Sequence, residues 1–296
     1  MYSIIIPHKN TTKLLERLLN SIPWTLHPQV IVVDDHSTET EYKQVVRLSE
    51  RYIFCLYRSD GIGPGGARNV GLQHATGKWI LFADSDDYYM SQADEMIRSH
   101  ENDDADIVFF NAHSTYSDTG KRAYRDKQIK ELIKRYKKNH HDDDVMKCLY
   151  TNPWGKMIRR ELIQKNDIAF EDIISGEDAL FSVLIGLAAH KIIVDEREMY
   201  CITVRPHSIT STLDKEHHES NGQARLRVNK YLRENGYGKY QLSVLYYIGM
   251  SHLYGWRYML HALKESCKGG NHPWVGAHKF LHPTIFKGEH YKKSTI

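Results

Sequence analysis

The chain has 296 residues, of which 41% are hydrophobic and 26% charged, and its formal net charge is +3 at pH 7. This composition is ample for a packed core, and the length suits one large domain or a domain with an appendage. It excludes a membrane-spanning protein, because no stretch approaches about 18 consecutive apolar residues, and we expect no signal peptide. The four cysteines are far apart and predict neither a zinc site nor a disulfide framework, so we expect a cytoplasmic protein.

The first 112 residues alternate between short apolar segments and amphipathic ones. Strands are predicted over residues 3–7, 29–35, 53–58, 78–86 and 106–112, and helices over residues 12–22, 40–52, 66–75 and 91–100. Short apolar strands separated by helices are typical of βαβ units and of a mostly parallel sheet covered on both faces. We therefore expect an α/β fold.

The middle of the chain is less regular. Residues 126–150 are highly charged and predict a solvated helix pair or an insertion. Residues 151–164 and 174–190 each predict a loop followed by a helix. Residues 191–204 predict a hairpin that closes the domain.

The C-terminal part predicts two helices with apolar stripes, over residues 218–235 and 240–266. We therefore expect one domain over residues 1–212 and a helical extension over residues 213–296. Residues 215–296 carry 13 Lys and Arg against 5 Asp and Glu, a balance of +8. This basic, aromatic-rich extension suits an anionic partner, but a solvated helical face explains the charge equally well.

Polar residues follow three of the predicted strands: PHKN at residues 7–10, DDHS at 34–37 and DSDD at 84–87. The carboxyl ends of parallel strands meet at one edge of a sheet, and functional residues collect there. We expect these three segments to form one site.

The DSDD segment places three carboxylates in four residues, and these repel one another unless a cation binds among them. In an extended strand Asp84 and Asp86 would point to the same side and offer oxygen ligands to one Mg²⁺ or Mn²⁺ ion. The alternative is that DSDD caps the next helix. Because Ser91 and Asp94 already predict a capping box for that helix, we favour the metal site.

The GIGPGG loop at residues 61–66 matches the G-x-G-x-x-G fingerprint of dinucleotide-binding proteins. That fingerprint usually follows the first strand, whereas this loop follows the third and contains Pro64. A nicotinamide-dependent oxidoreductase is therefore the weaker alternative. We interpret the glycines as letting the backbone turn tightly and approach a bound base.

Six segments taken together resemble the motifs of family 2 glycosyltransferases of GT-A fold: SIIIPHKN, VIVVDDHS, GPGGARNVGL, WILFADSDD, NPWGKMIRREL and GEDALF. The resemblance covers residues 3–210 and is nearest to bacterial capsule and cell-surface polysaccharide enzymes. It implies a Rossmann-like, mostly parallel sheet flanked by helices. It also implies inverting, Mn²⁺- or Mg²⁺-dependent transfer of a sugar from a nucleoside-diphosphate sugar, most commonly a UDP-sugar. The acceptor would be a hydroxyl of a saccharide or lipid-linked saccharide, and no nucleic-acid partner is expected.

The resemblance also implies a role for each residue that matches a motif. The residues implied at the nucleotide sugar are Pro7, Asp34, Asp35, Arg68, Asp84, Ser85 and Asp86. Asp86 and Asp84 would hold the metal, with His207 as a further ligand. Asp178 would be the catalytic base. Trp154, Lys156 and Glu177 would border the acceptor or the diphosphate.

The residues themselves leave simpler interpretations open. Ser175 to Asp178 is a capping box ahead of an apolar helix, so only the resemblance favours Asp178 as a base. Trp154 is equally well explained as a core residue, and Lys156 as one more charge in a charged run. A lone His207 is more often structural. A non-catalytic nucleotide-sugar-binding module and a hydrolase built on two carboxylates also stay open.

For residues 213–296 the family motifs imply nothing. Their Tyr and Trp content and positive charge would suit docking on an anionic membrane that carries a lipid-linked acceptor. They would also suit a dimer interface or a lid over the acceptor site. Our hypothesis is a peripheral contact with the inner face of the membrane.

Overall fold

The computed structural model describes residues 1–60, 63–205, 214–271 and 275. The chain divides into two units, Met1–Val204 and Arg205–Ile296. The predicted boundary after residue 212 falls outside the described residues and stays a prediction. No helix in the described ranges is both long and apolar enough to cross a bilayer.

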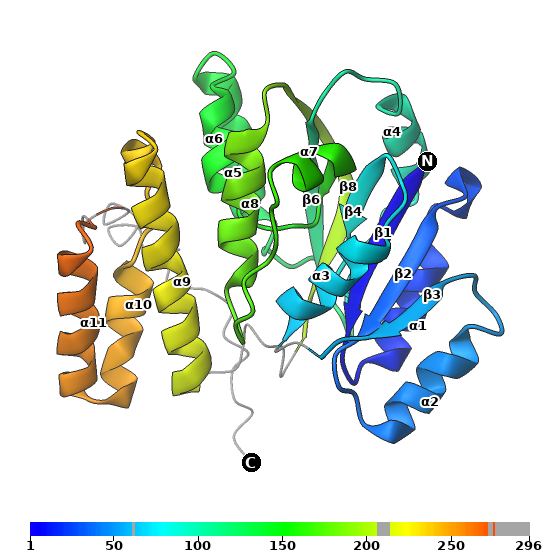
Figure 1. Ribbon diagram of the computed structural model, residues 1–296, viewed down its shortest axis with the longest axis horizontal. Helices are drawn as coiled ribbons and strands as arrows, with labels where there is room; N and C mark the ends of the chain where they lie inside the picture. The colour runs from blue at the N-terminus through cyan, green and yellow to red at the C-terminus, as the bar shows by residue number, and fades with distance from the viewer. Residues whose placement is uncertain (61–62, 206–213, 272–274, 276–296) are drawn as a thin grey trace. The chain divides into compact units, whose positions relative to one another are not determined.

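The first unit is built on an eight-stranded sheet with the strand order β3-β2-β1-β4-β7-β6-β8-β5 (Figure 1). Its strands are β1 (Tyr2–His8), β2 (Gln29–Asp34), β3 (Cys55–Arg58), β4 (Trp79–Phe82), β5 (Tyr88–Tyr89), β6 (Ile107–Tyr116), β7 (Lys156–Arg159) and β8 (Ile192–Val204). Strands β3, β2, β1 and β4 are parallel, as are β6 and β8, whereas β7 runs antiparallel to β4 and β6. The predicted α/β fold with a mostly parallel sheet is confirmed.

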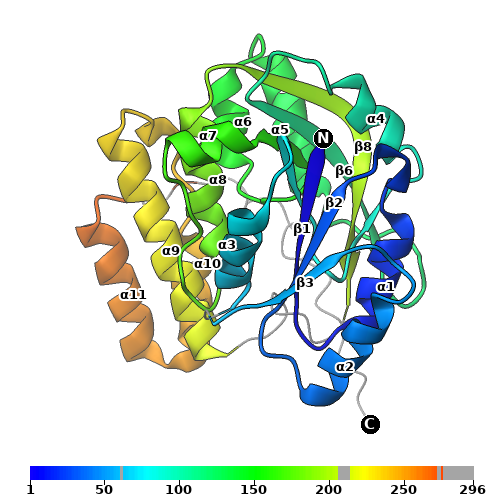
Figure 2. The same cartoon turned by 45° about the vertical axis from the view of Figure 1, so that its right-hand side comes forward.

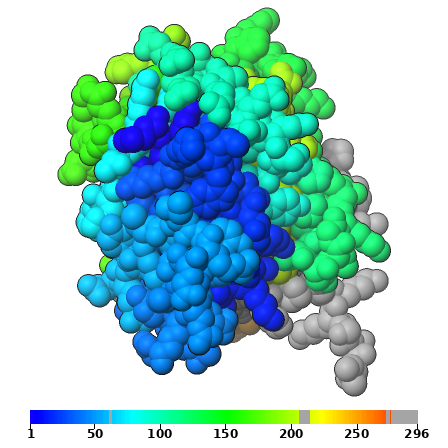
Figure 3. Space-filling view, turned by 90° about the vertical axis from the view of Figure 1, so that its right-hand side faces the viewer, coloured from blue at the N-terminus to red at the C-terminus, as the bar shows by residue number. Residues whose placement is uncertain are grey.

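The helices of this unit cover both faces of the sheet, and all seven residues of β1 are buried, as expected of a central parallel strand. These helices are α1 (Thr12–Ser21), α2 (Glu39–Leu48), α3 (Pro64–His74), α4 (Ala93–Ser99), α5 (Lys127–Lys138), α6 (Asp143–Leu149), α7 (Arg160–Lys165) and α8 (Glu177–Ala188). Helix α3 packs on β1 and β2 (Figure 2). The surface over α1 and α2, coloured blue, forms much of one side of the unit (Figure 3).

The predicted hairpin over residues 191–204 is wrong. The segment is one strand, β8, which pairs along its length with β6 and at Tyr200 and Cys201 with β5. The polar run DERE at residues 195–198 resembles a turn, but it lies where the register between β6 and β8 shifts around Asn111. Its glutamates are held by α5, because Glu196 pairs with Lys137 and Glu198 with Lys130.

The charged middle segment forms the predicted helix pair, α5 and α6. Helix α5 buries Ile129, Leu132 and Ile133 and contacts β6, and α6 packs against α8. Strand β7 was not predicted, because its four residues precede α7 directly and offer too short an apolar run.

The second unit contains α9 (Lys215–Glu234), α10 (Leu245–Met250) and α11 (Trp256–Lys268), which lie side by side (Figures 1 and 2). The single helix predicted over residues 240–266 is wrong, because a 3₁₀ turn over Ser251–Tyr254 separates α10 from α11. Gly255 follows that turn with φ 103° and ψ 152°. Essentially only glycine adopts this conformation, so α11 begins at the next residue.

Gly71 sets how closely α3 approaches β1. A Cβ at this position would lie 2.3 Å from Cγ2 of Ile5, with no free space between helix and strand. We expect Gly71→Ala to lower the free energy of unfolding by about 1–3 kcal/mol through overpacking, measured by urea denaturation. Gly249→Ala is the control. A Cβ at Gly249 would meet nothing within 4 Å, and this change should be neutral or stabilise by up to about 1 kcal/mol. Equal stabilities for the two variants would refute the packing role of Gly71.

Candidate active site

The structure brings the three polar segments together, because β2, β1 and β4 are neighbours in the sheet. The backbone N–H of Asp35 donates to the carbonyl of His8 at 2.8 Å. The hydroxyls of Thr11 and Ser85 are hydrogen-bonded at 2.9 Å, which links the end of β1 to the DSDD segment. The predicted convergence of these segments at one edge of the sheet is confirmed.

Asp34 and Asp35 stabilise this edge of the sheet through hydrogen bonds. Asp34 is fully buried, and its carboxylate accepts hydrogen bonds from Nδ1 of His8 at 3.2 Å and from the backbone of Ser37 at 3.2 Å. Burial lowers the pKa of His8, which keeps the ring neutral. Asp35 accepts from Ser59 at 3.0 Å and from Lys9 at 3.4 Å. A direct contact of Asp34 with a base or ribose is therefore not supported. Pro7, the other residue implied here, is buried within β1.

We call Asp84–Asp87 the acid turn. The segment is not extended, because the backbone N–H of Asp87 donates to the carbonyl of Asp84 at 3.0 Å. The prediction that Asp84 and Asp86 point to the same side of an extended strand is therefore wrong. The acid turn also does not cap a helix, since β5 follows it and α4 begins only at Ala93. The capping box predicted at Ser91 is absent as well, because the residue that precedes α4 is Gln92 and makes no side-chain cap.

Three residues that sequence reasoning missed hold the acid turn in place. Tyr200 of β8 accepts a hydrogen bond from the backbone N–H of Asp84 at 2.8 Å. The backbone N–H of Thr203 donates to the Asp87 carboxylate at 2.7 Å, and its hydroxyl donates to the carbonyl of Asp86. Arg17 of α1 donates to the same carbonyl. No motif marks these residues, because Arg17 lies in an ordinary amphipathic helix and the other two in the misassigned hairpin.

The acid turn concentrates negative charge. Burial, together with the charges of Asp86 and Asp84, raises the pKa of Asp87 well above its usual value. Burial and the charge of Asp86 also raise the pKa of Asp84, although Arg68 opposes this. A cation would relieve this repulsion, so the donor set fits a hard divalent ion.

A metal ion here would have few protein ligands. Within the described ranges, no group of three or more His, Cys, Asp or Glu side chains is placed to hold one. Asp86 and Asp84 would supply one or two carboxylates, which is the usual protein share for Mg²⁺ beside substrate phosphates and water. His207 lies outside the described residues.

Arg68 joins the acid turn to α8. Its Nη2 donates to Asp84 at 2.8 Å and its Nη1 to Glu177 at 2.6 Å, and its side chain is only 5% exposed. Burial alone would lower the pKa of Arg68, but the charges of Asp84, Glu177 and Asp178 raise it, so the guanidinium stays charged. Its two terminal nitrogens each bind a carboxylate of the site.

Asp178 lies in the first turn of α8. The predicted capping box is absent, because the residue that precedes the helix is Gly176, with φ 92° and no side-chain cap. Burial and the neighbouring charge of Glu177 raise the pKa of Asp178 to about 7, against an opposing effect of Arg68. A carboxylate with such a pKa is well matched to general-base catalysis near neutral pH.

Trp154 and Lys156 lie beneath the site and not on its surface. Trp154 is 5% exposed and stacks on Tyr200, with 5.6 Å between the ring centroids. Lys156 is 1% exposed, and its Nζ donates to the carbonyl of Tyr150 at 2.7 Å. Burial lowers the pKa of Lys156 well below its usual value, with Asp178 opposing. The core interpretation holds for Trp154, and neither side chain borders an open acceptor surface.

Packing explains two glycines of the loop, Gly63 and Gly65, whereas residues 61 and 62 lie outside the described residues. A Cβ at Gly65 would lie 2.5 Å from the carbonyl oxygen of Glu171 and 2.9 Å from Cγ of Glu177. Gly63 has φ 80° and faces the backbone of Ile173. These glycines let the start of α3 lie against the chain that leads into α8, and no dinucleotide is needed to account for them.

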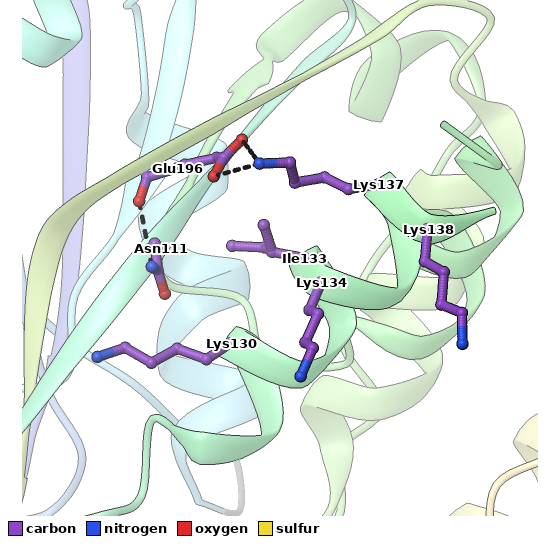
Figure 4. A pocket seen from close by; sticks show the side chains of 7 residues that line it. All are labelled: Asn111, Lys130, Ile133, Lys134, Lys137, Lys138 and Glu196. Carbon is purple, nitrogen blue, oxygen red and sulfur yellow. Dashed lines mark hydrogen bonds and ion pairs between the residues drawn. The ribbon is translucent and has the colours of Figure 1, made fainter. Parts of the chain in front are cut away.

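A groove of about 570 Å³ lies elsewhere, between α5 and strands β6 and β8 (Figure 4). It is lined by Asn111, Lys130, Ile133, Lys134, Lys137, Lys138 and Glu196. Lys137 pairs with Glu196 at 2.8 Å. Because the groove is lined by four lysines and one carboxylate, it does not suit a divalent cation, and the strand ends remain the candidate active site.

Comparison with known sequences agrees with the motifs. The family model for glycosyl transferase family 2 matches residues 3–166. The poly(ribitol-phosphate) beta-N-acetylglucosaminyltransferase TarS of Staphylococcus aureus is 30% identical over 219 residues, which span 69% of this chain but only 36% of TarS. The cholesterol galactosyltransferase of Borreliella burgdorferi is 26% identical over 283 residues, 85% of this chain and 75% of that protein.

Solved structures agree in fold. Residues 1–349 of S. aureus TarS in complex with UDP-GlcNAc match with a TM-score of 0.61 at 24% identity, over 90% of this chain and 72% of that one. The mannosyltransferase PcManGT of Pyrobaculum calidifontis, in complex with GDP-Man and Mn²⁺, matches with a TM-score of 0.57 at 16% identity, over 96% and 81%. The GT-A fold that the motifs implied is confirmed.

Proposed function

This chain belongs to glycosyl transferase family 2, and on that premise we propose that it transfers a sugar from a UDP-sugar to a hydroxyl of a saccharide or lipid-linked saccharide in polysaccharide biosynthesis. The UDP carrier is proposed because the similar TarS structure holds UDP-GlcNAc, although PcManGT holds GDP-Man. Since the chain aligns with about a third of TarS, the acceptor is proposed only as a chemical class.

One observation carries the proposal. A half-buried carboxylate with a pKa raised to about 7, Asp178, lies next to Glu177, which Arg68 joins to the acid turn at the end of β4. The strand ends are where an open α/β sheet binds a nucleotide. Arg68 therefore links the edge of the sheet that would bind the donor with the helix that carries the proposed general base.

In the proposed reaction, Asp178 takes the proton of the acceptor hydroxyl while that oxygen attacks the anomeric carbon. The bond from the anomeric carbon to the diphosphate oxygen breaks on the opposite face, so the configuration inverts and no covalent enzyme intermediate forms. Asp84, Ser85 and Asp86 of the acid turn orient the donor. A divalent ion held by Asp86 and Asp84 would supply positive charge against the charge that develops on the departing diphosphate.

The location of the reaction follows from the acceptor. A lipid-linked saccharide would bring this chain to the cytoplasmic face of the membrane, and residues 213–296 would make the contact. Their aromatic content and positive balance support this part of the proposal.

Ligand-induced stabilisation tests the donor site. A diphosphate that binds only the folded protein, at about 100 times its Kd, should stabilise it by about 2.7 kcal/mol. In thermal unfolding with UDP, GDP, CDP, dTDP or NAD, we expect stabilisation by UDP with Mn²⁺ and none in Asp86→Ala. The matched control is Asp104→Ala, because the Asp104 carboxylate is fully exposed, and it should respond like the wild type. Stabilisation by NAD without metal would contradict the proposal, and UDP binding without turnover of any UDP-sugar would indicate a binding module.

A further inference from the structure

Exposed apolar side chains are concentrated in one stretch of the second unit. Among the described residues, nine large hydrophobic side chains are exposed, and five of them fall between residues 246 and 263. These five are Tyr246, Leu253, Trp256, Leu260 and Leu263. The other four are scattered over the first unit. A contiguous exposed apolar patch is typical of a docking surface.

Three of these side chains form a stripe along α11. Trp256, Leu260 and Leu263 are spaced by four and three residues, which places them on one face of a helix with about 100° between successive residues. Their exposed fractions are 64%, 49% and 38%. The buried residues of the helix, Ala262 and Ser266, lie on a different face, about 110° around the helix from the stripe, so the stripe is not part of the core of the helical unit.

A cationic stripe runs beside the apolar one. Arg257, Lys264 and Lys268 are spaced by seven and four residues, and all three are exposed. The guanidinium of Arg257 lies 5.5 Å from the centroid of the Trp256 ring. An apolar face with Trp and Leu, flanked by Lys and Arg, is the pattern of a helix that lies in a membrane interface. Long basic side chains can then reach lipid phosphates while their stems cover apolar surface.

We propose that this face of α11 docks on an anionic membrane surface. Trp256, Leu260 and Leu263 enter the boundary between headgroups and acyl chains, and the cationic stripe faces the lipid phosphates. A second copy of the chain is the less favoured partner for this face. A two-fold interface buries the same patch of both copies, so their cationic stripes would lie close together and repel each other. The proposal names the surface for the membrane contact of the proposed function, and it does not require sugar transfer.

Vesicle co-sedimentation of the full chain tests the docking face. The chain should bind vesicles that contain phosphatidylglycerol more tightly than vesicles of phosphatidylcholine alone, and less tightly as salt rises. The double variant Trp256→Ala with Leu260→Ala should bind at least about tenfold more weakly. The double variant Arg257→Gln with Lys264→Gln should bind about 30-fold more weakly, since each cation near an anionic surface contributes about fivefold.

Matched controls come from the first unit. Val46→Ala with Ile53→Ala removes two exposed apolar side chains, and Lys134→Gln with Lys138→Gln removes two lysines of the α5 groove. Both controls should bind vesicles like the wild type, and thermal unfolding should show all four variants folded.

Three results would overturn the proposal: no vesicle binding by the wild type at low salt, equal losses in the controls, or a changed oligomeric state of the α11 variants without a change in vesicle binding. Transfer to a soluble acceptor should be unchanged in the α11 variants, which separates this proposal from the proposed function.

Discussion

Replacing Asp178 by asparagine is expected to lower kcat for sugar transfer by about 10²–10⁴-fold, because the acceptor hydroxyl loses the group that takes its proton. Asparagine is nearly isosteric and cannot accept that proton. Donor binding should change little, since the acid turn and Arg68 are untouched. The measurement is the release of UDP from a UDP-sugar in the presence of a saccharide acceptor, together with the thermal shift caused by UDP.

The pH dependence gives a second readout of the same group. Burial and the charge of Glu177 raise the pKa of Asp178 to about 7, and only the deprotonated carboxylate can act as a base. The wild-type kcat should therefore reach a plateau above pH of about 7 and fall about tenfold for each pH unit below it. The residual activity of Asp178→Asn should lack this limb.

Asp172→Asn is the matched control for Asp178→Asn, because Asp172 is an exposed carboxylate in the chain that leads into the same helix. Its kcat and pH profile should be those of the wild type. If Asp178→Asn keeps the acidic limb, or if both variants lose activity equally, another group is the base.

The strand ends could be predicted from sequence because their signal is local. Buried parallel strands such as β1 and β2 are nearly continuous apolar runs, and the polar residues that follow them mark the edge of the sheet. Any open parallel sheet places such ends together, so the convergence of Asp34, Ser37 and the acid turn needed no tertiary information.

The residues that hold the acid turn in place could not be predicted, because their positions depend on which distant strands pair in the sheet. Tyr200 and Thr203 reach Asp84, Asp86 and Asp87 only because β8 is one strand beside β6 and β5, and the polar run within β8 conceals this. Arg17 is more than 60 residues from the turn and lies in an ordinary helix pattern.

Burial of charged groups is the other feature that local sequence hides. Lys and Asp are almost never fully buried, so the expectation for Lys156 and Asp34 was contact with a ligand or with solvent. Asp34 is buried because His8 and the Ser37 backbone satisfy its oxygens. Lys156 is buried with a single carbonyl partner and two aromatic rings beside it.

Arg68→Met is expected to lower the free energy of unfolding by about 3–5 kcal/mol, because it leaves Glu177 and Asp84 without their shared cation. The Glu177 side chain is 6% exposed and the Asp84 side chain 32%, so water replaces little of what is lost. Methionine keeps most of the apolar contact with Phe170, whose ring centroid lies 5.3 Å from the guanidinium carbon of Arg68. Urea denaturation of both proteins measures the difference.

Arg197→Met is the matched control for Arg68→Met, because Arg197 is 42% exposed and pairs with Asp195. Solvent reaches the Arg197 side of that pair, and Asp195 keeps His100 as a second partner, so the loss of Arg197 should cost no more than about 1 kcal/mol. Equal losses in the two variants would mean that the burial of Arg68 contributes nothing to the strength of its pairs.

Lowering the pH should partly rescue Arg68→Met, and the direction follows from Asp84. Burial and the charge of Asp86 already raise the pKa of Asp84, and the loss of Arg68 removes the cation that opposes this rise. A carboxyl whose pKa is raised on folding destabilises the folded protein when it is charged, and this loss of stability is fully present above the raised pKa. It is relieved as the carboxyl takes up a proton. The deficit relative to the wild type should therefore shrink as the pH falls from 7 towards about 4, the pKa of an unfolded aspartate. A deficit that stays constant with pH would mean that Arg68 stabilises the fold by packing on Phe170 and not by pairing with the carboxylates of the site.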